Sequence, residues 1–150
     1  MKFSVGTDHR GFEFKAELKK ALEAEGHLVK DCGTDSPGAC DYPEFAQKVA
    51  EDVAQGRAEL GFLICGTGHG MSIAANKVPG IRAVTAYDEV TARLAREHNN
   101  ANVLVLPGSL ISAAQGIGLA KAFLAAKFEG GRHIGRLAKI TEIERKYSKP

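Results

Sequence analysis

Hydrophobic positions along the chain alternate between short apolar runs and longer stretches with helical spacing. Short apolar runs predict strands, and apolar residues three or four positions apart predict the buried face of a helix. The predicted strands cover residues 3–5, 27–30, 60–64, 81–85 and 102–106. The predicted helices cover residues 12–25, 41–56, 71–77, 88–98, 112–128 and 132–147.

Strands that alternate with helices are typical of an α/β fold, in which helices cover both faces of a parallel sheet. Residues 60–64 are apolar on both faces, as expected for a central strand. We therefore expect a Rossmann-like, doubly wound five-stranded parallel sheet in a single domain over residues 1–150. The last helix follows the last strand and makes no crossover, so its apolar side chains need a partner. This domain or a second subunit can supply it, and the pattern favours a second subunit.

Composition narrows the class of protein. The chain has 44% hydrophobic and 25% charged residues, which is ordinary for a globular domain. A net charge of +2, evenly spread, does not predict a nucleic-acid surface. No apolar run approaches the roughly 20 residues of a membrane span. Three irregularly spaced cysteines and the absence of a signal-peptide pattern predict a reduced, cytoplasmic protein.

Polar residues follow three of the predicted strands, where parallel sheets bind their ligands. They are Asp8-His9, Cys65 with residues 66–70, and residues 107–109. The loop Gly66-Thr67-Gly68-His69-Gly70 can turn backbone N–H groups toward an anion, although a tight turn without a ligand has the same composition. It is neither a dinucleotide fingerprint, because Met71 replaces the last glycine, nor a Walker loop.

Cys65 directly precedes this loop and the helix after it. That position is expected to lower the pKa of the thiol and to favour a thiolate, which serves as a base or a nucleophile. The alternative is a small buried apolar residue, and this is the interpretation adopted for Cys32 and Cys40.

Three further groups of polar residues are candidates for function. His98 ends a helix, where the dipole favours a protonated imidazole suited to a general acid or to a C-terminal cap. Arg132 and Arg136 share one helical face and suit a phosphate or a solvated surface. Asp8-His9 suits sugar hydroxyls or a turn. No metal site is expected, because the five histidines are isolated in the sequence.

Seven segments stand in order between residue 3 and about residue 145: Gly6-Thr7-Asp8-His9-Arg10-Gly11-Phe12, Asp41-Tyr42-Pro43, Ile64-Cys65-Gly66-Thr67-Gly68, Ser72-Ile73-Ala74-Ala75-Asn76-Lys77, Gly80-Ile81-Arg82-Ala83, His98-Asn99-Asn100-Ala101-Asn102-Val103 and Glu129-Gly130-Gly131-Arg132-His133. Together they resemble the type B ribose-5-phosphate isomerase family, which includes the subunits of galactose-6-phosphate isomerase.

The resemblance implies an aldose–ketose isomerase that interconverts ribose 5-phosphate and ribulose 5-phosphate through a cis-enediolate, with no metal and no cofactor. It implies that Cys65 moves a proton between C2 and C1, that His98 helps to open the furanose ring, and that Thr67 assists. The implied substrate-binding residues are Asp8, His9, Tyr42, Gly66, Gly68, Gly70, Asn99, Arg132 and Arg136. In this family the two arginines bind the phosphate across a homodimer interface, and pairing into a tetramer stays open.

Two positions depart from the family pattern. His69 stands where many members carry a small or apolar residue, and it is taken as a further pocket residue, with exposure to solvent as the alternative. Leu110 stands where many members carry an arginine, which sometimes engages the phosphate. A tetrose 4-phosphate, or a hexose 6-phosphate such as allose or galactose 6-phosphate, therefore remains an alternative substrate.

Two other classes of protein fit parts of the pattern. A non-catalytic phosphosugar-binding protein needs the loop and the arginines, but it has no need of Cys65 as a base or His98 as an acid. A flavodoxin-like nucleotide-binding protein fits the fold, but the broken glycine pattern opposes it. The isomerase accounts for the largest number of these residues.

Overall fold

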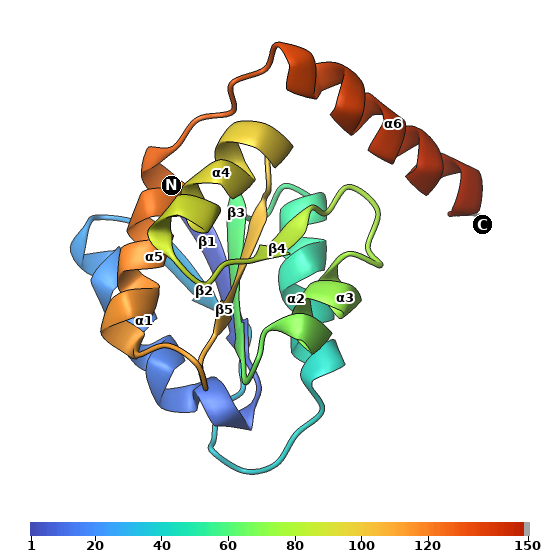
Figure 1. Ribbon diagram of the computed structural model, residues 1–150. Coiled ribbons are helices and arrows are strands. Elements are labelled where there is room, and N and C mark those ends of the chain that lie inside the picture. The colour runs from blue at the N-terminus through green and yellow to red at the C-terminus, as the bar shows by residue number, and fades with distance from the viewer. Residues whose placement is uncertain (149–150) are drawn as a thin grey trace.

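The computed structural model describes residues 1–148 and places one parallel sheet between two layers of helices (Figure 1). The strands are β1 (Lys2–Thr7), β2 (Leu28–Asp31), β3 (Leu60–Cys65), β4 (Ala83–Thr85) and β5 (Val103–Pro107). The helices are the 3-10 turn η1 (His9–Gly11), α1 (Phe12–Ala24), α2 (Tyr42–Ala54), α3 (His69–Ala75), α4 (Glu89–Asn99), α5 (Ala113–Ala125) and α6 (Arg132–Tyr147). The order β2-β1-β3-β5-β4, all parallel, confirms the doubly wound five-stranded sheet.

The central strand β3 explains how two hydrophobic cores form. All six of its residues are buried, and successive side chains of a strand point to opposite faces of the sheet. Phe62 and Ile64 join the core under α1, α4 and α5, whereas Leu63 and Cys65 join the core under α2 and α3. Figure 1 shows these two helical layers on either side of the sheet.

The topology determines where a ligand pocket forms. From β1 the chain goes to β2 on one side and then returns to β3 on the other side of β1. In open α/β sheets the crevice at such a reversal, outside the carboxyl ends of the strands, is the usual ligand site. That crevice lies between the ends of β1 and β3.

Several predicted element boundaries are shifted by one to three residues, and hydrogen bonds between distant segments accompany two of the shifts. The helix expected over residues 112–128 ends at Ala125, because the backbone turns extended at Ala126 and the N–H of Glu129 then donates to the carbonyl of Glu97 at the end of α4. The strand expected over residues 81–85 is shorter and covers only β4 (Ala83–Thr85). The N–H of Arg82 does not bond to a neighbouring strand but donates to the side chain of Asn102.

Helix α6 extends away from the rest of the molecule, and His133 is its only buried residue among those described (Figure 1). The side chain of Glu144 accepts a hydrogen bond from the N–H of Gly80 at 2.9 Å, and a groove of about 790 Å³ lies between α6 and residues 76–84. The apolar residues Ile134, Ile140 and Ile143 of α6 are half or more exposed. Nowhere in residues 1–148 is a helix long and apolar enough to cross a membrane.

A buried carboxylate connects β1, β2 and α2. Asp52 is 1% exposed and accepts hydrogen bonds from Lys30 at 2.9 Å and Arg57 at 2.7 Å. Its second oxygen accepts from the hydroxyl of Ser4 and the thiol of Cys32. Burial alone would raise the pKa of Asp52, but the hydrogen bonds from Lys30, Arg57 and Ser4 hold the pKa well below its usual range. The folded state therefore favours the ionised carboxylate.

We expect Asp52→Asn to lower the free energy of unfolding by about 2–3 kcal/mol, because an amide keeps the shape but loses two charge-assisted hydrogen bonds. A carboxylate whose pKa is depressed by folding stabilises the protein above its unfolded pKa. This gain begins to decline as the pH falls below about 4 and is lost only below the folded pKa, so the difference at pH 3 is smaller than at pH 7 but not zero. Urea unfolding at pH 7 and pH 3 measures both effects. Glu51→Gln, on the same helix, serves as the control and should change the stability by less than about 0.5 kcal/mol. An equal difference between Asp52→Asn and the native chain at both pH values would contradict this account.

Candidate functional site

A pocket of about 350 Å³ opens at the carboxyl ends of β1 and β3, at the reversal of the sheet order. Polar side chains and glycines line most of it: Asp8, His9, Arg10, Cys40, Tyr42, Cys65, Gly66, Thr67 and Gly70. The larger groove beside α6 contains neither a cysteine nor a histidine. We therefore take the smaller pocket as the candidate active site.

The end of β1 supplies two of the predicted residues. Asp8 is 6% exposed, and its side chain caps η1 by accepting from the N–H of Arg10 at 3.0 Å. The hydroxyl of Thr7 donates to the carbonyl of Ile64 at 2.8 Å, which holds the end of β1 against β3. His9 Nδ1 accepts from the N–H of Cys40 at 3.4 Å, so the neutral ring carries its proton on Nε2. The imidazole N–H is thus available to a ligand.

The glycine loop wraps around the sulfur of Cys65. Gly68 has φ +85°, and a Cβ there would lie 2.6 Å from the side chain of Thr85. This left-handed turn directs the N–H of Gly68 to the Sγ of Cys65 at 3.2 Å. A Cβ at Gly70 would collide with the ring of Tyr42, so glycine there allows the ring to close one wall of the pocket. The loop therefore presents backbone donors beside a buried thiol.

The expected direction of the Cys65 pKa is wrong. Burial raises the pKa of the Cys65 thiol above its ordinary value, and the negative charge of Asp8 adds to the increase. The N–H groups of Met71 and Gly68, together with the charge of Arg10, act in the opposite direction without overcoming burial. The thiol lies at a strand end 6% exposed, so loss of water contributes more than the short helix α3.

The structure does not bring the remaining predicted residues to this pocket. His98 and Asn99 end α4, next to the start of β5, whereas Cys65 pairs with Pro107 at the end of β5. The length of β5 separates these two edges of the sheet by about 16 Å. Arg132 and Arg136 begin α6 on the same edge as His98. The predicted site residues of one chain therefore lie at two opposite edges of the sheet. We call the pocket with Cys65 the first half of the site, and the edge with His98, Asn99, Arg132 and Arg136 the second half.

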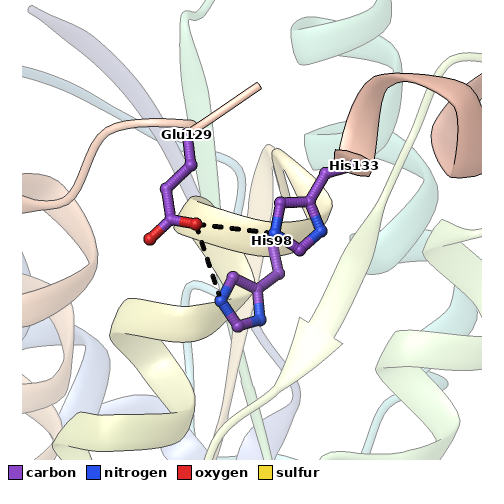
Figure 2. A group of neighbouring side chains, drawn as sticks. All are labelled: His98, Glu129 and His133. Carbon is purple, nitrogen blue, oxygen red and sulfur yellow. Dashed lines mark ion pairs between the residues drawn. The ribbon is translucent and has the colours of Figure 1, made fainter. Parts of the chain in front are cut away.

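A histidine pair lies in the second half (Figure 2). The rings of His98 and His133 stack with their centroids 4.4 Å apart, and one carboxylate oxygen of Glu129 lies 3.9 Å and 3.5 Å from their respective Nε2 atoms. Because His98 is more than thirty positions from Glu129 and His133, the sequence gave no sign of the cluster. The five histidines are isolated in the sequence, but the fold brings two of them together with a carboxylate, so isolation in the sequence is no ground for excluding a metal-binding cluster.

Several residues differ in role from the sequence interpretation. Cys40, taken as structural, lines the pocket with its sulfur 3.9 Å from His9 Nδ1, and its position two residues before Tyr42 was a signal for this. Arg10 lines the pocket beside Gly66, although no role was expected for it. His69 and Leu110 are exposed and do not line the pocket.

Comparison with known proteins agrees with the resemblance seen in the sequence. Residues 3–140 match the family model described as Ribose/Galactose Isomerase. The ribose-5-phosphate isomerase B of Escherichia coli is 44% identical over 145 residues, which cover 97% of each chain. A putative sugar phosphate isomerase of Bacillus subtilis is 42% identical over 147 residues, 97% of this chain and 99% of that one.

Solved structures resemble the whole fold. Ribose-5-phosphate isomerase B from Clostridium thermocellum superposes with a TM-score of 0.97 at 47% identity, over 99% of this chain and 100% of the other. The isomerase B of Mycoplasma genitalium, solved with bound ribulose-5-phosphate, superposes with a TM-score of 0.94 at 41% identity over 97% of both chains.

Proposed function

Because this chain belongs to the Ribose/Galactose Isomerase family and is an isomerase, we propose that it interconverts ribose 5-phosphate and ribulose 5-phosphate. In this proposal Cys65 is the base and His98 is the acid that opens the sugar ring. The observation that carries the proposal is the Cys65 thiol, which meets a backbone N–H of the glycine loop in a pocket beside Asp8 and His9.

The proposed chemistry assigns each proton. His98 protonates the ring oxygen of the furanose as the bond from C1 to that oxygen breaks and the O1 hydroxyl loses its proton to solvent. The Cys65 thiolate then removes the proton from C2, the electrons form a C1–C2 double bond, and the negative charge develops on O1. A proton moves from O2 to O1, a carbonyl forms at C2, and the Cys65 thiol returns its proton to C1. Backbone N–H groups of the glycine loop stabilise the negative oxygen, which in enzymes contributes a few kcal/mol per donor.

The raised pKa of Cys65 is a cost to this scheme, because the thiol must lose its proton to solvent before the thiolate can act. A base must be deprotonated to act, and burial opposes ionisation in the free pocket. Arg10 lies against the loop and favours the thiolate. A thiol that is protonated at rest also resists oxidation, since the thiolate is the reactive form.

The two halves of the site support a dimer in which two copies complete each active site. The pocket with Cys65 lies at one edge of the sheet, and His98, Asn99, Arg132 and Arg136 lie at the other. In a two-fold symmetric dimer, the edge with His98 in one copy can lie against the pocket of the other copy. Each active site then contains the base Cys65 from one chain, and the acid His98 and the arginines Arg132 and Arg136 from its partner. Each dimer then has two equivalent sites.

The projecting helix α6 supports the same arrangement. Its apolar side chains Ile134, Ile140 and Ile143 are left half or more exposed by its own chain. Exposed apolar patches of this kind mark interaction sites. A second copy that covers these side chains also places Arg132 and Arg136 against a neighbouring pocket.

The direct test of the function is the conversion of ribose 5-phosphate to ribulose 5-phosphate by purified protein in the presence of EDTA. We expect turnover that the chelator does not reduce. Turnover only with tetrose or hexose phosphates would overturn the substrate assignment, and binding of phosphosugars without any turnover would support the non-catalytic alternative.

We expect Arg136→Ala to raise KM about 10- to 100-fold with a smaller change in kcat, because a charge-assisted hydrogen bond to phosphate is lost. Steady-state kinetics measures both constants. Arg145→Ala, on the last turn of the same helix, is the matched control and should leave KM unchanged. An unchanged KM in Arg136→Ala, together with a dissociated dimer, would make Arg136 an interface residue only.

A further inference from the structure

The cluster of His98, Glu129 and His133 has the composition of a transition-metal site. Two imidazole nitrogens and one carboxylate oxygen lie within 4.8 Å of one another (Figure 2). Zinc sites that keep an open position use three protein ligands of this kind, with a water or another molecule as the fourth. The three side chains come from the end of α4, the connection after α5 and the first turn of α6.

Backbone hydrogen bonds hold these three segments together. The N–H of Glu129 donates to the carbonyl of Glu97 at 3.0 Å, which places the carboxylate beside the end of α4. The N–H of His133 donates to the carbonyl of Gly130 at 3.0 Å, at the start of α6, which begins three residues after Glu129. The main chain therefore positions the cluster independently of the side-chain interactions.

His133 provides an independent sign of a missing partner. Its side chain is 6% exposed, and among the described residues its Nε2 atom is buried without a hydrogen-bond partner. This nitrogen lies 3.5 Å from Glu129, on the side where His98 also presents its Nε2 (Figure 2). A buried polar atom without a partner costs free energy, and a cation between these atoms would remove that cost.

The dimensions suit a small divalent cation. Ligand distances of 2.0–2.2 Å place tetrahedral donor atoms about 3.3 Å apart. The distances from Glu129 to the two histidines are 3.5 Å and 3.9 Å, and all three donor atoms lie within 4.8 Å of one another, so the side chains must move closer together to bind an ion. The nearly parallel rings, 17° apart, must rotate about their side-chain bonds for their lone pairs to converge. In a single chain His98 is 35% exposed and Glu129 is 47% exposed, and this open side of the cluster faces the pocket of the second copy in the proposed dimer.

We propose that His98, Glu129 and His133 bind one Zn²⁺ per chain and that this ion reversibly inhibits the isomerase. The inhibition rests on the proposed function, in which His98 must carry a proton to the sugar ring. A zinc-bound Nε2 has no proton to donate, so occupancy removes the acid. The charges of Arg132 and Arg136 nearby oppose a dication and the charge of Glu129 favours it, so the ion is expected to exchange with a chelator.

The binding experiment uses EDTA-treated protein, dialysed free of chelator and titrated with ZnCl₂ by calorimetry. We expect one equivalent per chain, and we expect His133→Gln and Glu129→Gln each to weaken binding at least about tenfold. His27→Gln is the matched control, because His27 lies 3.9 Å from Glu25 in a histidine–carboxylate pair that lacks a second histidine. Unchanged affinity in both cluster variants would overturn the site.

Cobalt distinguishes this cluster from the pocket thiols. Co²⁺ in a nitrogen–oxygen site shows visible d–d bands without a thiolate-to-cobalt charge-transfer band in the near ultraviolet. We expect the d–d bands alone, and we expect His133→Gln to abolish them. A charge-transfer band would assign the ion to Cys40 with His9, and would overturn the proposal.

Activity provides a separate readout. We expect one equivalent of zinc to inhibit the native enzyme, EDTA to restore the rate, and His133→Gln to be less sensitive to zinc than the native chain. Stoichiometric binding at the cluster without inhibition would overturn the regulatory role. Zinc binding by a protein that turns over no sugar phosphate would instead leave the metal site standing and overturn the proposed function.

Discussion

The Cys65→Ala protein is expected to lose turnover of ribose 5-phosphate by about 10³-fold or more, while it still binds the sugar phosphate. Alanine removes the only group proposed to take the proton from C2, and water cannot replace it in a buried position. The arginines at the other edge still bind the phosphate, so affinity changes little. A ketose assay measures turnover, and calorimetric titration with ribose 5-phosphate measures binding.

Cys32→Ala is the control for the loss of a thiol in general. Cys32 belongs to the hydrogen-bond network of Asp52, away from the candidate active site, and its replacement should affect stability rather than rate. Urea unfolding of both variants separates the two effects. Normal turnover by folded Cys65→Ala would remove the thiolate mechanism.

A mixture of the inactive variants Cys65→Ala and His98→Gln is expected to regain about one quarter of the native activity after subunit exchange. Half of the dimers formed at equal concentrations are mixed, and each mixed dimer has one active site with both native residues. The other site of the same dimer combines both substitutions. Refolding the two proteins together, followed by the ketose assay, measures the recovery.

Two variants from the same half of the site provide the matched control. Cys65→Ala and Asp8→Ala both change the pocket between β1 and β3, so every site in their mixture carries a defective pocket. This mixture should stay inactive. If the cross-half mixture also stays inactive although mixed dimers are isolated, each active site lies within one chain, and the proposed dimer is wrong.

Much of the fold follows from local patterns in the sequence. The residues of β3 are apolar at every position, and only a strand covered on both faces tolerates that pattern. The helix boundaries at Asp88 and Ser112 follow from caps that accept backbone N–H bonds at Thr91 and Gln115. The predicted end of α5 is wrong because a tertiary hydrogen bond, from Glu129 to Glu97, redirects the chain.

The candidate site was identified in part from local chemistry and in larger part from the family resemblance. A cysteine at a strand end before glycines is visible in the sequence, since strand ends of parallel sheets gather at one edge. The direction in which the Cys65 pKa shifts was not visible in the sequence, because the burial of the sulfur depends on side chains from elsewhere in the chain. Cys40 was overlooked for the same reason, because its contact with His9 spans 31 positions.

The sequence by itself determined the alternation of strands and helices, the buried central strand and the glycine loop beside Cys65, since these depend on residues close together in the chain. Only the tertiary structure decided that Cys65 and His98 lie at opposite edges of the sheet and that His98 stacks on His133. Both arrangements depend on packing between segments that are distant in the sequence. The spacing of residues along the chain does not determine their distances in the folded protein.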